Sequence, residues 1–185
     1  GSEMCIRDSC MTSSIVYGVS QGTDNTDYIN RAINGGDNIN MDKLESGSEN
    51  YNADNNFYRI DTSENVDNWC MFWKLSSMRC FHSVVSTSIM DFYSSIGQTR
   101  DVASRMETKV YPLRSLFSVK YYFNELTESE RKGITEVSKP ETLANLYGFE
   151  YVDTQNGFNI YENKYYVPMG FTYDYYCLDS DIQKA

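Results

Sequence analysis

Short runs in which apolar and polar residues alternate recur along the chain, and they predict β-strands because alternate side chains of a strand face opposite sides of a sheet. The clearest of these runs occupy residues 57–61, 118–123, 149–153 and 158–162. Asn156-Gly157 lies between the last two runs and predicts a tight hairpin. We expect a further strand at 165–172, with Pro168 placing it at a sheet edge or at the start of the strand, and a strand or partly buried ribbon in the aromatic run 69–75.

A helical spacing of apolar residues is strongest after residue 86. Ser86 or Thr87 can cap a helix over 88–96, and Gly97 ends it. Its apolar stripe, which we expect to face the core, consists of Ile89, Phe92, Tyr93 and Ile96. Shorter helical segments are predicted where Pro or Thr opens a turn, at 112–117, 127–132 and 140–148.

Residues 10–56 are polar and rich in Asn, Asp and Gly, so we expect a loop-rich arm. Two short helices are predicted inside it, one capped by Asp24 or Thr26 and one that begins after Asn40. The arm precedes a domain at 57–185 that contains the predicted strands. The order of elements predicts an α+β fold, with a mostly antiparallel sheet and short helices on one face.

The composition is that of a folded protein with a polar surface. Aromatic residues make up 15% of the 185 residues and charged residues 23%, so the chain can bury a core. The formal net charge of −10 argues against non-specific binding to nucleic acid, and we expect no nucleic-acid partner. The charge is uneven, because residues 68–122 carry seven bases and three acids between flanks of net −7 (20–67) and −6 (123–185).

No stretch approaches the ~18 consecutive apolar residues of a membrane-spanning helix. Residues 1–9 back-translate to a DNA string that resembles the transposase adapter used for sequencing libraries, so we treat them as an artefact and exclude them from the fold. We therefore expect a translated metagenomic fragment of a longer bacterial protein, truncated at its C-terminal side.

Cysteines and the single histidine give no pattern typical of a metal or catalytic site. The spacing of Cys10, Cys70, Cys80 and Cys177 matches no Cys-x-x-Cys motif. A disulfide between Cys70 and Cys80 can form if the protein lies outside the cytoplasm. Cys80 and His82 lack the third group that orients a catalytic pair. Nucleotide, hydrolase and metalloprotease motifs are absent from the sequence. We expect no catalytic residue, no metal and no cofactor.

Four motifs in a fixed order resemble those of the YfhO family of bacterial membrane proteins. They are Phe57-Tyr58-Arg59-Ile60-Asp61; Phe81-His82-Ser83 with Asp91-Phe92-Tyr93 and Ile96-Gly97; Leu116-Phe117-Ser118-Val119-Lys120-Tyr121-Tyr122-Phe123; and Gly157 to Tyr161, Tyr161-Glu162-Asn163 and Pro168-Met169-Gly170-Phe171. They lie within residues 57–173, about two thirds of the chain. Two positions depart from the family pattern: Phe117 stands where a small residue is usual, and Val167 replaces a common Leu.

The resemblance implies an extracytoplasmic region of a polytopic membrane glycosyltransferase of the GT-C type. Such a protein uses a lipid-linked sugar and glycosylates cell-envelope polymers such as teichoic acids. Its catalytic acid lies in an early loop of the membrane block, so this region is expected to be non-catalytic. The implied partners are the transmembrane block of the same protein and an envelope glycopolymer or lipid-linked sugar.

Two groups of residues are candidates for ligand contact. Trp69 and Trp73 can form a stacking platform for sugar rings, or they can pack in the core or at an interface with the rest of the longer protein. The second group can contact phosphates of a polyanionic acceptor or of lipid headgroups, or it can pair with the acidic flanks. Its members are Arg100, Arg105, Lys109 and Arg114.

Two other classes of function stay open beside the membrane protein. One is a free-standing carbohydrate-binding or adhesion module that uses the surface of Trp69 and Trp73. The other is a soluble enzyme with an unrecognised site, which would need convergent polar groups in a pocket.

Overall fold

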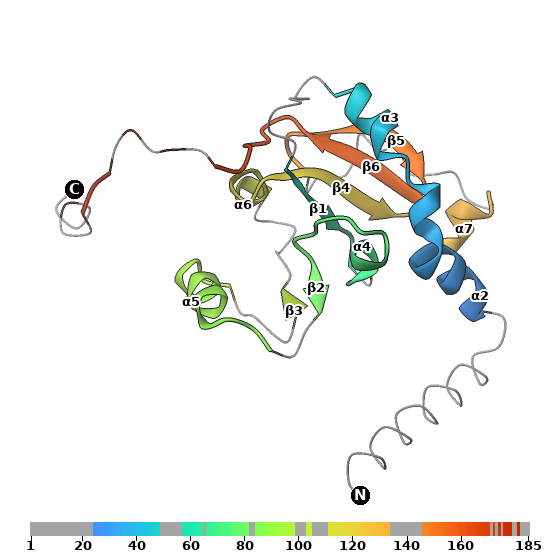
Figure 1. Cartoon of the computed structure of the whole chain (residues 1–185), viewed down its shortest axis with the longest axis horizontal. Coiled ribbons are helices and arrows are strands. Elements are labelled where there is room, and N and C mark those ends of the chain that lie inside the picture. Colours follow the sequence, from blue (N-terminus) through green and yellow to red (C-terminus); the bar gives the residue numbers. More distant parts are fainter. Residues whose placement is uncertain are drawn as a thin grey trace, which may run out of the picture.

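The computed structural model describes residues 24–48, 57–64, 66–81, 84–98, 103–104, 111–133, 146–170, 172, 174, 176–178 and 181. At its centre is a four-stranded sheet in the order β1-β4-β6-β5 (Figure 1). The strands are β1 (Arg59–Thr62), β4 (Val119–Glu125), β5 (Phe149–Gln155) and β6 (Phe158–Asn163). β1 runs parallel to β4 and the other neighbours are antiparallel, which confirms the predicted α+β class.

The hairpin of β5 and β6 forms at the predicted turn. Asn156 and Gly157 both have positive φ, 48° and 75°, as the tight turn favoured between twisted strands requires. β6 is buried along its whole length, between β4 and β5. Phe123 of β4 lies opposite Ile160 of β6, so their side chains share one face of the sheet.

That face carries the main core. It is covered by the helical segments η1 (Ile29–Ile33), α3 (Met41–Ser46) and α4 (Trp69–Phe72). The buried apolar residues that meet there are Ala32, Leu44, Ile60, Val66, Trp69, Cys70, Trp73, Tyr121, Phe123, Phe158 and Ile160. A smaller cluster of Tyr122, Tyr161, Leu146 and Phe149 includes residues of β4 and β6 that face the other way.

Residues 24–48 pack on the sheet, although the sequence predicted a loop-rich arm. α2 (Asp24–Tyr28) continues into η1, a π-helical turn, and a short 3₁₀ turn, η2 (Gly35–Asn38), leads towards α3. The predicted cap is confirmed, because the Asn40 side chain accepts a hydrogen bond from Lys43 N. The rest of the predicted arm, 10–23 and 49–56, lies outside the described residues.

Arg31 explains why this segment docks. Its Nε donates to the Asn156 carbonyl oxygen at 3.3 Å, and Asn156 Nδ2 donates back to the Arg31 carbonyl oxygen at 3.0 Å. Arg31 Nη1 lies 2.9 Å from Glu125 Oε1. The guanidinium also lies 5.2 Å from the ring centres of Trp69 and Phe158, within the range of a cation–π contact.

Three predicted helices form close to their expected positions: α5 (Thr87–Ser95), α6 (Tyr111–Leu116) and α7 (Glu128–Arg131). Thr127 and Glu130 form a reciprocal capping box at the start of α7. A two-stranded ribbon of β2 (Cys80–Phe81) and β3 (Ala103–Ser104) and the helix α5 lie apart from the main sheet (Figure 1). The predicted helix at 140–148 lies mostly outside the described residues.

Two strand predictions were wrong. Trp69–Phe72 is the helix α4: a helical turn brings Trp69, Cys70 and Trp73 to the same core, whereas in a strand Cys70 would face the side opposite to both tryptophans. The described residues of 165–172 are turn and coil. There Tyr166 Oη donates at 2.8 Å to the carbonyl oxygen of Phe57, two residues before β1.

Candidate functional site

Lys120 is the centre of a polar cluster formed by three of the motif segments and α3. We call it the Lys120 cluster; its members are Lys120, Glu45, Ser48, Tyr58, Tyr121, Glu162 and Tyr166. The ammonium nitrogen lies 5.5, 5.4 and 5.8 Å from the ring centres of Tyr58, Tyr121 and Tyr166. The Lys120 side chain is 2% exposed. The aromatic faces therefore replace much of the solvent that an ammonium group would otherwise have.

Two carboxylates belong to the same cluster. Tyr58 Oη donates to Glu45 Oε1 at 2.5 Å, and Ser48 Oγ donates to Glu162 Oε1. Burial lowers the pKa of Lys120, while the charges of Glu162 and Glu45 act in the opposite direction. Burial raises the pKa of Tyr58, and the hydrogen bond to Glu45 adds to this effect. Clusters of perturbed titratable groups are typical of functional sites and also of structural ion networks.

A second buried network surrounds Asp61 of β1, and we call it the Asp61 network. Asp61 Oδ2 accepts from Arg114 Nε at 2.8 Å, and Oδ1 accepts from Arg79 Nε at 3.3 Å. The Thr62 backbone N–H also donates to Oδ1. Asp61, Arg79 and Arg114 are 1%, 3% and 0% exposed. Arg79 Nη1 lies 3.9 Å from Asp67, so two bases and two acids neutralise one another.

Trp69 and Trp73 both lie in the main core and are each 6% exposed. Their rings make edge contacts with each other at 5.9 Å and with Phe158 at 5.8 and 5.5 Å. Trp73 Nε1 donates to the Arg31 carbonyl oxygen at 3.1 Å. A sugar ring cannot stack on either indole without displacing this packing, so the structure places both residues as the core alternative requires.

Of the four bases proposed for phosphate contact, the structure describes only Arg114. It is enclosed, and its partner Asp61 belongs to the acidic stretch 20–67, as the pairing alternative expected. Arg100, Arg105 and Lys109 lie outside the described residues. Cys70 is a buried free thiol and Cys80 is half-buried, and burial raises the pKa of Cys70 to about 12.

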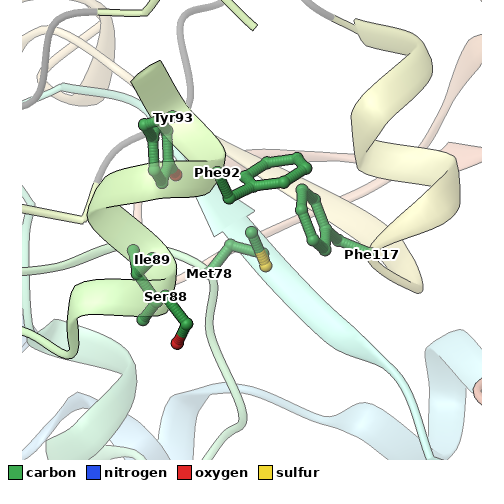
Figure 2. Close-up of a pocket in the computed structure, with 6 residues that line it drawn as sticks. All are labelled: Met78, Ser88, Ile89, Phe92, Tyr93 and Phe117. Atoms are coloured by element: carbon green, nitrogen blue, oxygen red, sulfur yellow. The ribbon is translucent and has the colours of Figure 1, made fainter. Parts of the chain in front are cut away.

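An apolar pocket of about 270 Å³ lies between α5 and the end of α6. Figure 2 shows Ile89, Phe92 and Tyr93 projecting from α5, with Met78 and Phe117 on the other side. The Phe92 and Phe117 rings meet edge to face at 5.2 Å. Phe117 therefore gives α5 an aromatic contact with the residue that follows α6.

Lys120 and Glu162 lie inside the motifs but were not among the predicted site residues, and Glu45 lies outside the motifs. The available signal was a lysine within the apolar run Val119-Lys120-Tyr121-Tyr122-Phe123, because a charge in a buried strand needs a partner. No signal pointed to Glu45, which comes from the predicted arm. Among the described residues, no group of three or more His, Cys, Asp or Glu could hold a metal ion.

Together these features define an α+β region in which charged motif residues lie in two buried polar networks. None of the helices in the described ranges has the length and apolar character needed to cross a bilayer. The family described as Bacterial membrane protein YfhO matches residues 8–185, so the chain belongs to the YfhO family. No curated protein and no solved structure gives a significant match to the chain.

Proposed function

We propose that this chain is a non-catalytic, extracytoplasmic part of a polytopic YfhO protein whose membrane block transfers sugar from a lipid-linked donor to a cell-envelope polymer such as teichoic acid. One observation supports the non-catalytic role: three of the charged motif residues, Asp61, Lys120 and Glu162, are buried, each at 4% exposure or less. Their side chains contact other protein groups. Such residues stabilise a sheet and position its surface.

The role that fits this construction is a rigid cap on the membrane block that handles the acceptor polymer. A rigid element suits positioning because it holds a bound group near the reacting atoms at little further entropic cost. The partners in this proposal are the transmembrane block of the same protein and the envelope glycopolymer.

Cys177 provides a direct test of sidedness, because it is an exposed thiol while Cys70 is buried. The experiment uses the full-length protein in intact bacterial cells, treated with a membrane-impermeant maleimide. We expect labelling that disappears in Cys177→Ser. Labelling of Cys177 only after the cells are lysed would place this region in the cytoplasm and refute the proposal.

Acceptor handling is tested separately in cells. A full-length protein from which residues 57–170 are removed is expected to insert in the membrane but to leave the envelope polymer with fewer sugars per phosphate. Membrane insertion is checked by fractionation. Unchanged polymer glycosylation would show that this region has no part in the reaction.

A further inference from the structure

A cavity of about 190 Å³ opens between the end of α3, the start of β1 and the segment that follows α4. Its polar lining comes from Glu45, Tyr58, Lys74 and Ser76. Phe57, 41% exposed, contributes an aromatic ring, and Ile60 and Leu75 complete the apolar part of the wall. At ~30 Å³ per water molecule the space equals roughly six waters, which is the scale of one small ring and not of a chain.

The walls of this cavity are fixed by the fold. Ile60 N donates to the Ser76 carbonyl oxygen at 2.8 Å, and Met78 N donates to the Ile60 carbonyl oxygen at 3.0 Å. Lys74 has a φ of 59°, at the position after a helix end where glycine is usual. The Glu45 carboxylate is held by Tyr58 Oη at 2.5 Å. The polar groups are therefore oriented before any ligand arrives.

The charged residues that line the cavity are one acid and one base. Glu45 and Lys74 line it, while Lys120 and Glu162 lie in the cluster behind Tyr58. The formal charges of these two acids and two bases cancel. An anion would meet the Glu45 carboxylate, and a cation would meet the Lys74 ammonium. A neutral ligand with several hydroxyl groups is repelled by neither the Glu45 carboxylate nor the Lys74 ammonium. It can form hydrogen bonds with both of them.

We propose that this cavity binds one ring of a neutral, hydroxyl-rich ligand, as a single sugar residue of a glycan is. Its hydroxyls donate to Glu45 and accept from Lys74, and its C–H face lies against Phe57. The inference deepens the proposed function and rests on it for the biological use of the site. The binding itself depends only on the cavity.

The test uses the whole 185-residue chain and a panel of methyl glycosides of hexoses and N-acetylhexosamines. Amide chemical shifts are followed by NMR. We expect at least one glycoside to shift the amides of Phe57, Lys74 and Ser76 with a Kd of roughly 1–10 mM, typical for so small a contact area. No saturable shift with any glycoside would overturn the proposal.

Two variants test the roles of the lining groups. Glu45→Gln removes the strong acceptor and Phe57→Ala the exposed ring, and each is expected to weaken binding about tenfold. Glu150→Gln, an exposed acid on β5, is the matched control and is expected to bind normally. Fluorescence of the core tryptophans confirms that each variant is folded. Equal affinity in all three variants would overturn the assignment of the cavity.

Inorganic phosphate is the competing probe. Saturable shifts of the same amides with phosphate, and none with glycosides, would show an anion site and overturn the proposal. Failure here is distinguishable from failure of the proposed function. Glycoside binding with cytoplasmic labelling of Cys177 would refute the extracytoplasmic role alone, and extracytoplasmic labelling without glycoside binding would refute the cavity alone.

Discussion

Asp61→Asn is the most direct perturbation of the buried charge networks. The carboxylate accepts hydrogen bonds from Arg79 and Arg114, and its side chain is 1% exposed. The neutral amide would leave two guanidinium groups enclosed at 3% and 0% exposure with only Asp67 to oppose them. Removing one partner of a buried ion pair costs about 3–5 kcal/mol. This loss is a large fraction of the ~5–15 kcal/mol that stabilises a typical domain.

Urea unfolding followed by tryptophan fluorescence measures this loss, because Trp69 and Trp73 are both buried in the main core. With a slope of about 2 kcal/mol per molar urea, the midpoint should fall by roughly 2 M. The double variant Asp61→Asn, Arg114→Met replaces both partners of the pair. It is expected to be more stable than Asp61→Asn alone, since the uncompensated charge of Arg114 is gone. A free energy of unfolding within about 1 kcal/mol of the parent for Asp61→Asn would refute this account of the network.

Three further outcomes are expected. The pKa of Tyr58 is raised in the folded state, so above the ordinary tyrosine pKa of 10.0 the unfolded chain loses this proton first and the free energy of unfolding should fall as pH rises. Urea unfolding at about pH 9 and about pH 11 measures this fall. The fall should be smaller in Tyr58→Phe than in the parent protein. Phe117→Ala should cost about 2 kcal/mol and speed hydrogen exchange in α5 but not in β6. Gly157→Ala should destabilise more than Gly133→Ala, since both have positive φ but only at Gly157 would the new Cβ lie 2.7 Å from an arginine side chain; equal losses by thermal unfolding would contradict this.

The elements with a strong local signal were predictable from the sequence. Asn156-Gly157 predicted the β5–β6 hairpin, and the helical turn predicted at 127–132 corresponds to α7, whose start Thr127 and Glu130 cap. These signals depend on backbone geometry within a few residues, so the rest of the fold cannot easily override them.

Prediction failed where tertiary contacts decide the structure. The run 69–75 has strand-forming aromatics, yet its first part forms α4, because a helical turn brings Trp69, Cys70 and Trp73 to the same core. Short helices were predicted correctly within residues 24–48, but their packing on the sheet was not, because Arg31 ties them to Asn156 and Glu125, which lie far away in the sequence. Both results depend on partners from other segments, which a local pattern does not contain.

The candidate site also depends on partners from other segments of the chain, and this dependence explains why the motifs contain buried charged residues. A charge within a buried strand needs a partner, and here the partners come from other segments of the chain. Asp61 of β1 pairs with Arg114 of α6. Lys120 of β4 lies near the rings of Tyr58, before β1, and Tyr166, after β6. In β6, Asn163 Nδ2 donates to the Val119 carbonyl oxygen of β4 at 2.9 Å. An alternative register would leave these groups buried without partners, at a cost of several kcal/mol each. The motifs therefore specify which strands become neighbours, and the cavity beside Tyr58 is a consequence of that arrangement.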